Sequence, residues 1–206
     1  MSKETKDTLL EVRKAYRFLY QYQRKILDLV DFIGKSYGLN YSGGFSRFSN
    51  ASPRNGWGNL NSWAWDWLNM YFYEFKFKPL TKMGDEYTFS IILVNDTGSF
   101  LANKKDNKNA RTKLSAYEDV EKSETKLVFY VGKNSFAEFW ANWEINDFVL
   151  DEKGLNKIDQ NKIMLYKGYL LEDFENEEKA LLQLKDFEKY CAENNMAFKV
   201  IERKFD

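Results

Sequence analysis

The chain has 206 residues, of which 44% are hydrophobic and 17% are aromatic. This is enough apolar material to fill a core, so composition excludes a disordered protein. The charges of the 31 basic and 31 acidic residues cancel. The protein therefore has no net positive charge to attract it to bulk nucleic acid or to an anionic membrane. We therefore expect one domain over residues 1–206 and no bulk nucleic-acid binding.

The absence of histidine removes Ser-His and Cys-His nucleophile pairs, histidine zinc sites and histidine general bases. One cysteine, Cys191, forms no internal disulfide, which is typical of the reducing cytoplasm. Residues 1–12 lack an apolar signal-peptide core, and no run of about 18 apolar residues occurs, so we expect neither secretion nor a membrane span. These features favour a cytoplasmic protein without catalytic activity, metal or cofactor. Abundant lysine and asparagine suggest an AT-rich bacterial or phage genome.

The first predicted element is a helix over residues 6–37. Its apolar positions alternate steps of three and four residues, and one polar residue, Gln23, interrupts them. The stripe consists of Leu9, Val12, Tyr16, Leu19, Gln23, Ile26, Val30, Ile33 and Tyr37. Two interpretations stay open: the helix lies across a sheet as core, or part of it pairs with a second copy in a homodimer whose register Gln23 fixes.

Residues 38–61 show neither a helical nor an alternating period. Connections this long are uncommon in compact domains and are usually functional or disordered. Because aromatic residues recur through the segment and need burial, we expect an ordered, packed loop. Its aromatic and large apolar residues are Tyr41, Phe45, Phe48, Trp57 and Leu60.

A sheet is predicted from the next segments. A short helix to about Asn69 precedes a strand over residues 71–78, although a strand through Trp63, Trp65 and Trp67 is the alternative. The strand alternates Tyr71, Tyr73, Phe75 and Phe77 on one side with Phe72, Glu74, Lys76 and Lys78 on the other. Residues 86–95 follow a turn at 83–85, so the two strands make an antiparallel hairpin.

The remaining chain continues the sheet and adds a second helix. Residues 98–125 are the most polar stretch, which predicts a solvated loop. Strands are expected at 126–131, 162–171 and 196–202, an ambiguous element at 136–148, and an amphipathic helix at 174–194. The predicted fold is α+β, with a mostly antiparallel β-meander sheet packed by a long N-terminal helix and a C-terminal amphipathic helix.

Residues 38–61 carry the predicted binding site. The glycines of this segment allow backbone N–H groups to point at a ligand. Arginine guanidinium groups bind phosphate or carboxylate, and aromatic side chains stack on planar groups. The predicted binding residues are Arg47, Arg54, Asn55, Trp57, Trp63, Asp66 and Tyr71. We expect a small anionic or nucleotide-like ligand, or a protein partner, in bacterial or phage regulation, defence or counter-defence. In the competing interpretation, Arg47 or Arg54 pairs with Asp66 or Glu74 and only staples the loop.

The alternative function is a divalent-metal hydrolase or nuclease. Asp66 and Glu74 would hold Mg²⁺ while Lys76 steadies the attacking water. This pattern is weak, because glutamate and lysine recur with the same spacing in a chain that is 30% charged. Such pairs also occur at Glu4 and Lys6, at Glu124 and Lys126, and at Glu202 and Lys204.

Overall fold

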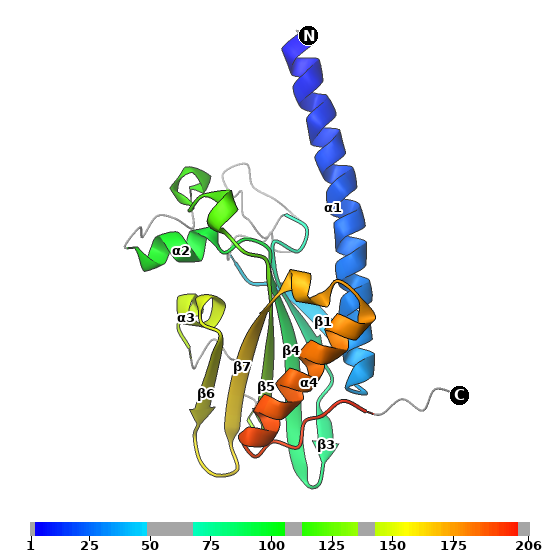
Figure 1. Ribbon diagram of the computed structural model, residues 1–206, viewed down its shortest axis with the longest axis vertical. Helices are drawn as coiled ribbons and strands as arrows, with labels where there is room; N and C mark the ends of the chain where they lie inside the picture. The colour runs from blue at the N-terminus through cyan, green and yellow to red at the C-terminus, as the bar shows by residue number, and fades with distance from the viewer. Residues whose placement is uncertain (1–2, 49–67, 106–112, 136–142, 202–206) are drawn as a thin grey trace, which may run out of the picture.

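The computed structural model describes residues 3–48, 68–105, 113–135 and 143–201. Figure 1 shows the arrangement of its helices and strands. The helices are α1 (Lys3–Ser36), α2 (Gly98–Lys104), α3 (Ile145–Leu150) and α4 (Glu177–Glu193), with short 3₁₀ helices at Leu114–Ala116, Val120–Lys122 and Leu171–Phe174. The strands are β1 (Tyr41–Ser46), β2 (Phe72–Phe77), β3 (Leu80–Lys82), β4 (Asp85–Val94), β5 (Lys126–Lys133), β6 (Lys153–Lys157) and β7 (Ile163–Leu170).

All seven described strands form one antiparallel sheet in the order β1-β2-β4-β5-β7-β6, and β3 pairs with the start of β4. The β3–β4 turn places both Met83 and Gly84 at positive φ, as a tight hairpin turn requires. The predicted α+β class, with its long first helix, antiparallel sheet and last helix, is confirmed.

The sheet buries both of its faces, and each face has its own apolar cluster. The C-terminal third of α1 and helix α4 cover one face, while α2 and α3 lie on the other (Figure 1). The strands serve both clusters because successive side chains point to opposite faces. On β4, for example, Ile91 and Leu93 join the first cluster, whereas Ile92 and Val94 join the second.

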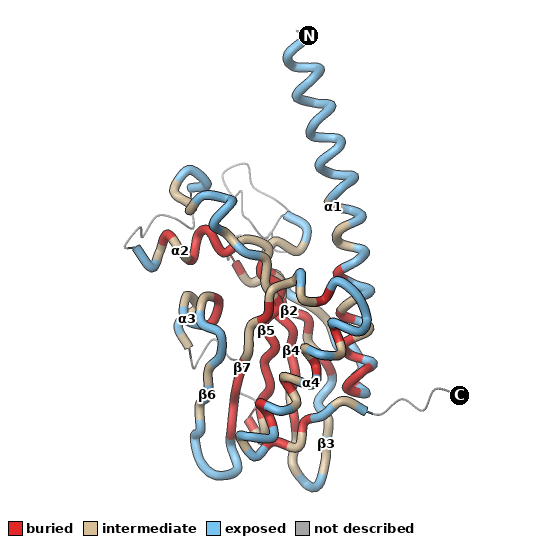
Figure 2. Tube along the Cα trace, in the orientation of Figure 1, coloured by how far each residue is buried: buried red, intermediate tan, exposed pale blue. Residues whose placement is uncertain are grey.

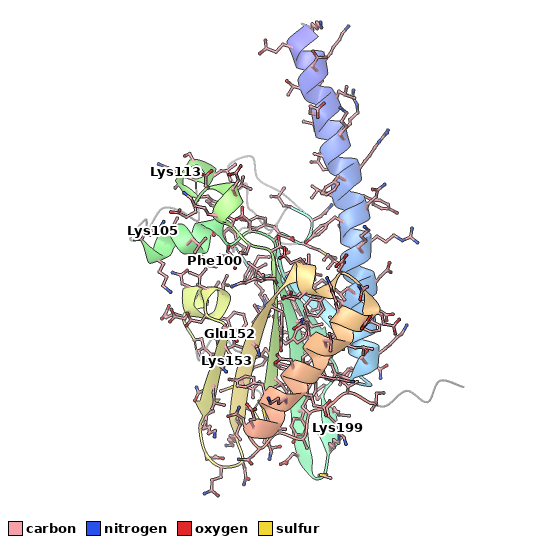
Figure 3. The ribbon with its side chains drawn as sticks, viewed as in Figure 1. Phe100, Lys105, Lys113, Glu152, Lys153 and Lys199 are labelled. Carbon is pink, nitrogen blue, oxygen red and sulfur yellow. The ribbon has the colours of Figure 1, made fainter. Side chains whose placement is uncertain are left out.

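The helix α1 has two parts with different surroundings. Residues 3–18 are all exposed, and Ile26 is the first buried residue of the helix (Figure 2). Below that point Ile33 is fully buried, Gly34 lies directly against the Phe77 ring, and the Tyr37 hydroxyl donates a 3.0 Å hydrogen bond to the Leu184 carbonyl of α4. Helix α1 is therefore anchored to the sheet through its C-terminal third.

Several boundaries differ from the sequence expectations. The expected loop 38–61 is wrong for residues 41–46, which form edge strand β1, because Gly43 and Gly44 hide the alternation of the segment. The expected polar loop 98–125 begins with α2, which buries Phe100. No strand forms over residues 196–201: Met196 and Phe198 enter the first apolar cluster from an extended segment. The expected helix before Asn69 lies mostly outside the described residues.

Strand β6 was not expected. It is an edge strand, and its exposed residues alternate with half-buried ones. Its polar sequence therefore lacks the β-branched and aromatic residues by which strands are recognised.

The two parts of α1 should respond differently to truncation of a side chain. Ile33→Ala should destabilise the fold by about 2–5 kcal/mol, because it opens a cavity in the core. Leu10→Ala, in the exposed part, should cost within roughly 0.5 kcal/mol. Urea unfolding of both variants measures the difference, and equal losses would contradict the division of α1.

Candidate functional site

A group of polar side chains lies on the sheet face that carries α2 and α3. We call Arg47, Glu74, Lys76 and Ser90 the Glu74 cluster. Glu74 and Lys76 are two residues apart on β2, and the β2–β4 register sets Lys76 opposite Ser90, so all three side chains share one face. Arg47 follows β1, where its N–H continues the ladder with a 3.1 Å bond to the Phe72 carbonyl.

Glu74 is the centre of this cluster and is only 2% exposed. Its Oε2 accepts a 2.8 Å hydrogen bond from Arg47 Nε, and its Oε1 accepts a 3.1 Å bond from Ser90 Oγ. Lys76 Nζ lies 3.7 Å from Oε1. A buried charge is tolerated only when it is paired and hydrogen-bonded, and this carboxylate meets both conditions.

The phenol of Tyr130 borders the cluster from β5, directly opposite Ser90 in the sheet register. Burial, and then the negative charge of Glu74, raise the pKa of the Tyr130 hydroxyl. The neutral phenol therefore persists across the physiological range, and Tyr130 supplies a hydroxyl, not a base.

Phe45 forms the outer part of the surface. It lies on β1 opposite Glu74, and its ring is 50% exposed. Arg47 Cζ and Lys76 Nζ each lie 5.3 Å from the ring centroid, within the range of a cation–π contact. The Arg47 and Lys76 side chains are 24% and 31% exposed. An accessible aromatic ring thus stands between two partly accessible cations, and these share one carboxylate.

The structure brings together three of the residues singled out from sequence: Arg47, Glu74 and Lys76. Of the pairings in the competing interpretation, that of Arg47 with Glu74 is present, while those of Arg54 and Asp66 lie outside the described residues. Tyr71 lies apart from the cluster, with its ring 5.1 Å from that of Phe48 and its hydroxyl 3.3 Å from the Tyr117 hydroxyl. Five other predicted residues lie outside the described part of the chain: Arg54, Asn55, Trp57, Trp63 and Asp66.

Sequence reasoning missed Phe45, Ser90 and Tyr130 as members of this surface. The spacing of two residues between Phe45 and Arg47 could have placed them side by side on one strand face. For Ser90 no local signal existed, because its position opposite Lys76 depends on which strands pair.

A second polar feature is a cleft of about 400 Å³ that is lined by residues of β5, β7 and α4. Its two lysines are mostly buried, and both have partners. Lys167 Nζ lies 2.7 Å from Asp186 Oδ2, an oxygen that also accepts a 2.7 Å bond from the Tyr169 hydroxyl. Lys126 Nζ lies 3.2 Å from Glu124. The cleft is therefore an ion-pair network that ties α4 to the sheet.

The comparisons with known proteins give one match. A family model described as PM0109 matches residues 2–196. The chain belongs to the PM0109 family. The matched range includes the Glu74 cluster, and the family's description states no activity or ligand. No curated protein and no solved structure matches the chain.

Within the described residues of this PM0109 family member, no group of three or more aspartate, glutamate or cysteine side chains is placed to bind a metal ion. No helix in the same residues is both long and apolar enough to cross a membrane.

Removing either partner of the Arg47–Glu74 pair should destabilise the fold, because the other charge is left poorly compensated. A double-mutant cycle of Arg47→Met and Glu74→Gln should give a coupling energy of about 1–3 kcal/mol. The exposed Lys14–Glu11 pair is the control, and should couple by roughly 0.2–0.5 kcal/mol. Equal coupling in both pairs would show that Glu74 is not effectively buried.

The Asp186 network should make stability depend on pH. Partial burial would raise the pKa of Asp186, but hydrogen bonds from Lys167 and Tyr169 outweigh it and hold that pKa below its ordinary value. The unfolded state therefore binds the proton more readily, so this stabilisation is present above about pH 4 and is lost as the pH falls through the folded-state pKa. Asp186→Asn should lower the free energy of unfolding at pH 7 and lower it less at pH 3, as measured by urea unfolding. A penalty that grows toward low pH would contradict the assignment.

Proposed function

We propose that this chain is a non-enzymatic binding protein that recognises a small anionic ligand with a planar group, such as a nucleotide, at the surface formed by Phe45, Arg47 and Lys76. The observation that carries the proposal is the pair of partly exposed cations around one exposed aromatic ring. Guanidinium and ammonium groups bind phosphate or carboxylate oxygens, and the ring offers a stacking surface to a base.

The buried carboxylate supports this proposal. Glu74 holds the Arg47 side chain through a 2.8 Å hydrogen bond from Nε. A preorganised side chain loses less conformational entropy when a ligand binds.

The small size of this surface favours a small ligand over a protein partner. Protein interfaces usually bury about 800 Å² on each side around central aromatic and arginine anchors. Among the described residues, the accessible part of this surface consists of the Phe45 ring and the Arg47 and Lys76 side chains. We also propose a cytoplasmic location, because the single cysteine, Cys191, is free and buried.

A Mg²⁺-dependent hydrolase built on Asp66, Glu74 and Lys76 is the alternative function. Both oxygens of Glu74 already accept hydrogen bonds, one from Arg47 and one from Ser90. A metal ion would have to displace a guanidinium from Glu74 to coordinate Oε2. The donor set around Glu74 therefore supports anion binding better than metal binding.

Thermal-shift measurements against nucleotides, cyclic dinucleotides, Mg²⁺ and Mn²⁺ test the proposal. A ligand at about 100 times its Kd stabilises the native state by about 2.7 kcal/mol, which raises the Tm by roughly 5–10 °C for a chain of this size. We expect an anionic nucleotide to give this shift. Arg47→Met should weaken binding about 10–100-fold, the loss expected for a charged hydrogen bond.

Lys82→Met is the matched control, since it removes a lysine from β3 and leaves the Glu74 cluster intact. Nucleotide binding that survives Arg47→Met and Lys76→Met would overturn the proposed site. A shift with Mg²⁺ or Mn²⁺ that is abolished by Asp66→Ala would favour the hydrolase instead.

A further inference from the structure

The N-terminal part of α1 extends beyond the sheet and exposes apolar side chains. Figure 1 shows the helix continuing past the body of the molecule, and Figure 2 shows that this part is exposed over its whole length. Leu9 is 39% exposed, Val12 43% and Tyr16 67%. In proteins most helical stability comes from tertiary packing of an apolar face, and these apolar side chains are exposed.

The exposed apolar residues continue the face that anchors the helix. Leu9, Val12, Tyr16 and Leu19 stand in the same sequence of three- and four-residue steps as Ile26, Val30, Ile33 and Tyr37. The latter group packs on the sheet. One face of α1 therefore covers the sheet from Ile26 onward, where the half-buried Tyr22 joins it, and is exposed from Leu9 to Tyr16.

We propose that two copies of this chain pair antiparallel through the open face of α1, along residues 5–23. The occupant is a second copy because this face is complementary to itself in one antiparallel register. That register sets Leu9 opposite Leu19 and Val12 opposite Tyr16 of the partner helix, so that apolar residues meet. It also sets Thr5 opposite Gln23, the two polar ends of the same stripe.

In this register each residue at one core position of the heptad faces a residue at the other core position, as in antiparallel coiled coils. Leu9, Tyr16 and Gln23 occupy one core position of the heptad, while Thr5, Val12 and Leu19 occupy the other. Each residue of the first set meets one of the second. The contact is isologous, since the same surface serves both copies, and it closes as a two-fold dimer.

A parallel pair is blocked by the body of the molecule. From Ile26 onward the face that would meet the partner lies against its own sheet. In a parallel pair the partner helix would run into the space which that sheet occupies. In an antiparallel pair the two sheets lie at opposite ends of the paired helices and do not meet.

The test uses Leu9→Cys and Leu19→Cys, each in the full chain under mild oxidation. Cys191 stays in place because it is buried, and the unsubstituted chain is the control for it. In the proposed register residue 9 faces residue 19, whereas two copies of residue 9 lie about 15 Å apart along the axis, too far for a disulfide. We expect a covalent dimer in the mixture of both variants and none in either variant alone.

Light scattering supplies a second measurement that needs no cysteine. The unsubstituted chain should have twice its monomer mass of 24.5 kDa. Tyr16→Glu should give the monomer mass, while Leu10→Glu, on the opposite side of the helix, should remain dimeric. Circular dichroism checks that both variants fold.

Three results would overturn the proposal. Disulfides in Leu9→Cys alone would indicate a parallel pair. A monomer at every protein and salt concentration would show that the open face does not bind a second copy. Association that appears only when a polyanion is added would assign the face to that partner.

Discussion

The fold places a carboxylate in the interior of a sheet face, and the site proposed above depends on how that charge is compensated. Glu74 is buried between apolar strands, so it needs partners from neighbouring elements. Arg47 comes from the edge of the sheet and Ser90 from β4. The same bond that neutralises Glu74 fixes Arg47 beside Phe45. Structural and proposed functional roles therefore meet in one ion pair, and either role alone would account for the pairing.

Helix α1 shows how one sequence pattern serves two purposes. From Ile26 onward its stripe fills the core, and over residues 3–18 the helix is exposed. The interpretation as a core element thus applies to the C-terminal part of the helix, and the proposed dimer concerns only the exposed part. The proposed site on β1 and β2 and the exposed face of α1 are separate surfaces.

Sequence reasoning worked where a pattern is local. The stripe of α1, the alternation of β2 and the amphipathic period of α4 are all visible in short windows, and all three elements are confirmed. It failed where the pairing partner decides the structure. Strand β1 is stabilised by β2 in spite of two glycines, and β6 depends on β7.

The candidate site could be predicted in part for the same reason. Arg47, Glu74 and Lys76 stand out by residue type, and the pairing of Arg47 with Glu74 is one of the arginine–carboxylate pairings that the sequence leaves open. The depth of Glu74 and the position of Ser90 depend on the register between β2 and β4, which no local pattern specifies.

The most direct test of the account is an NMR titration that follows the Arg47 Nε and Lys76 Nζ resonances while AMP or adenosine is added. If Phe45, Arg47 and Lys76 bind an anionic planar ligand, AMP should shift both resonances saturably, and uncharged adenosine should shift them much less. Unchanged resonances while AMP binds elsewhere on the chain would contradict the assignment of this surface.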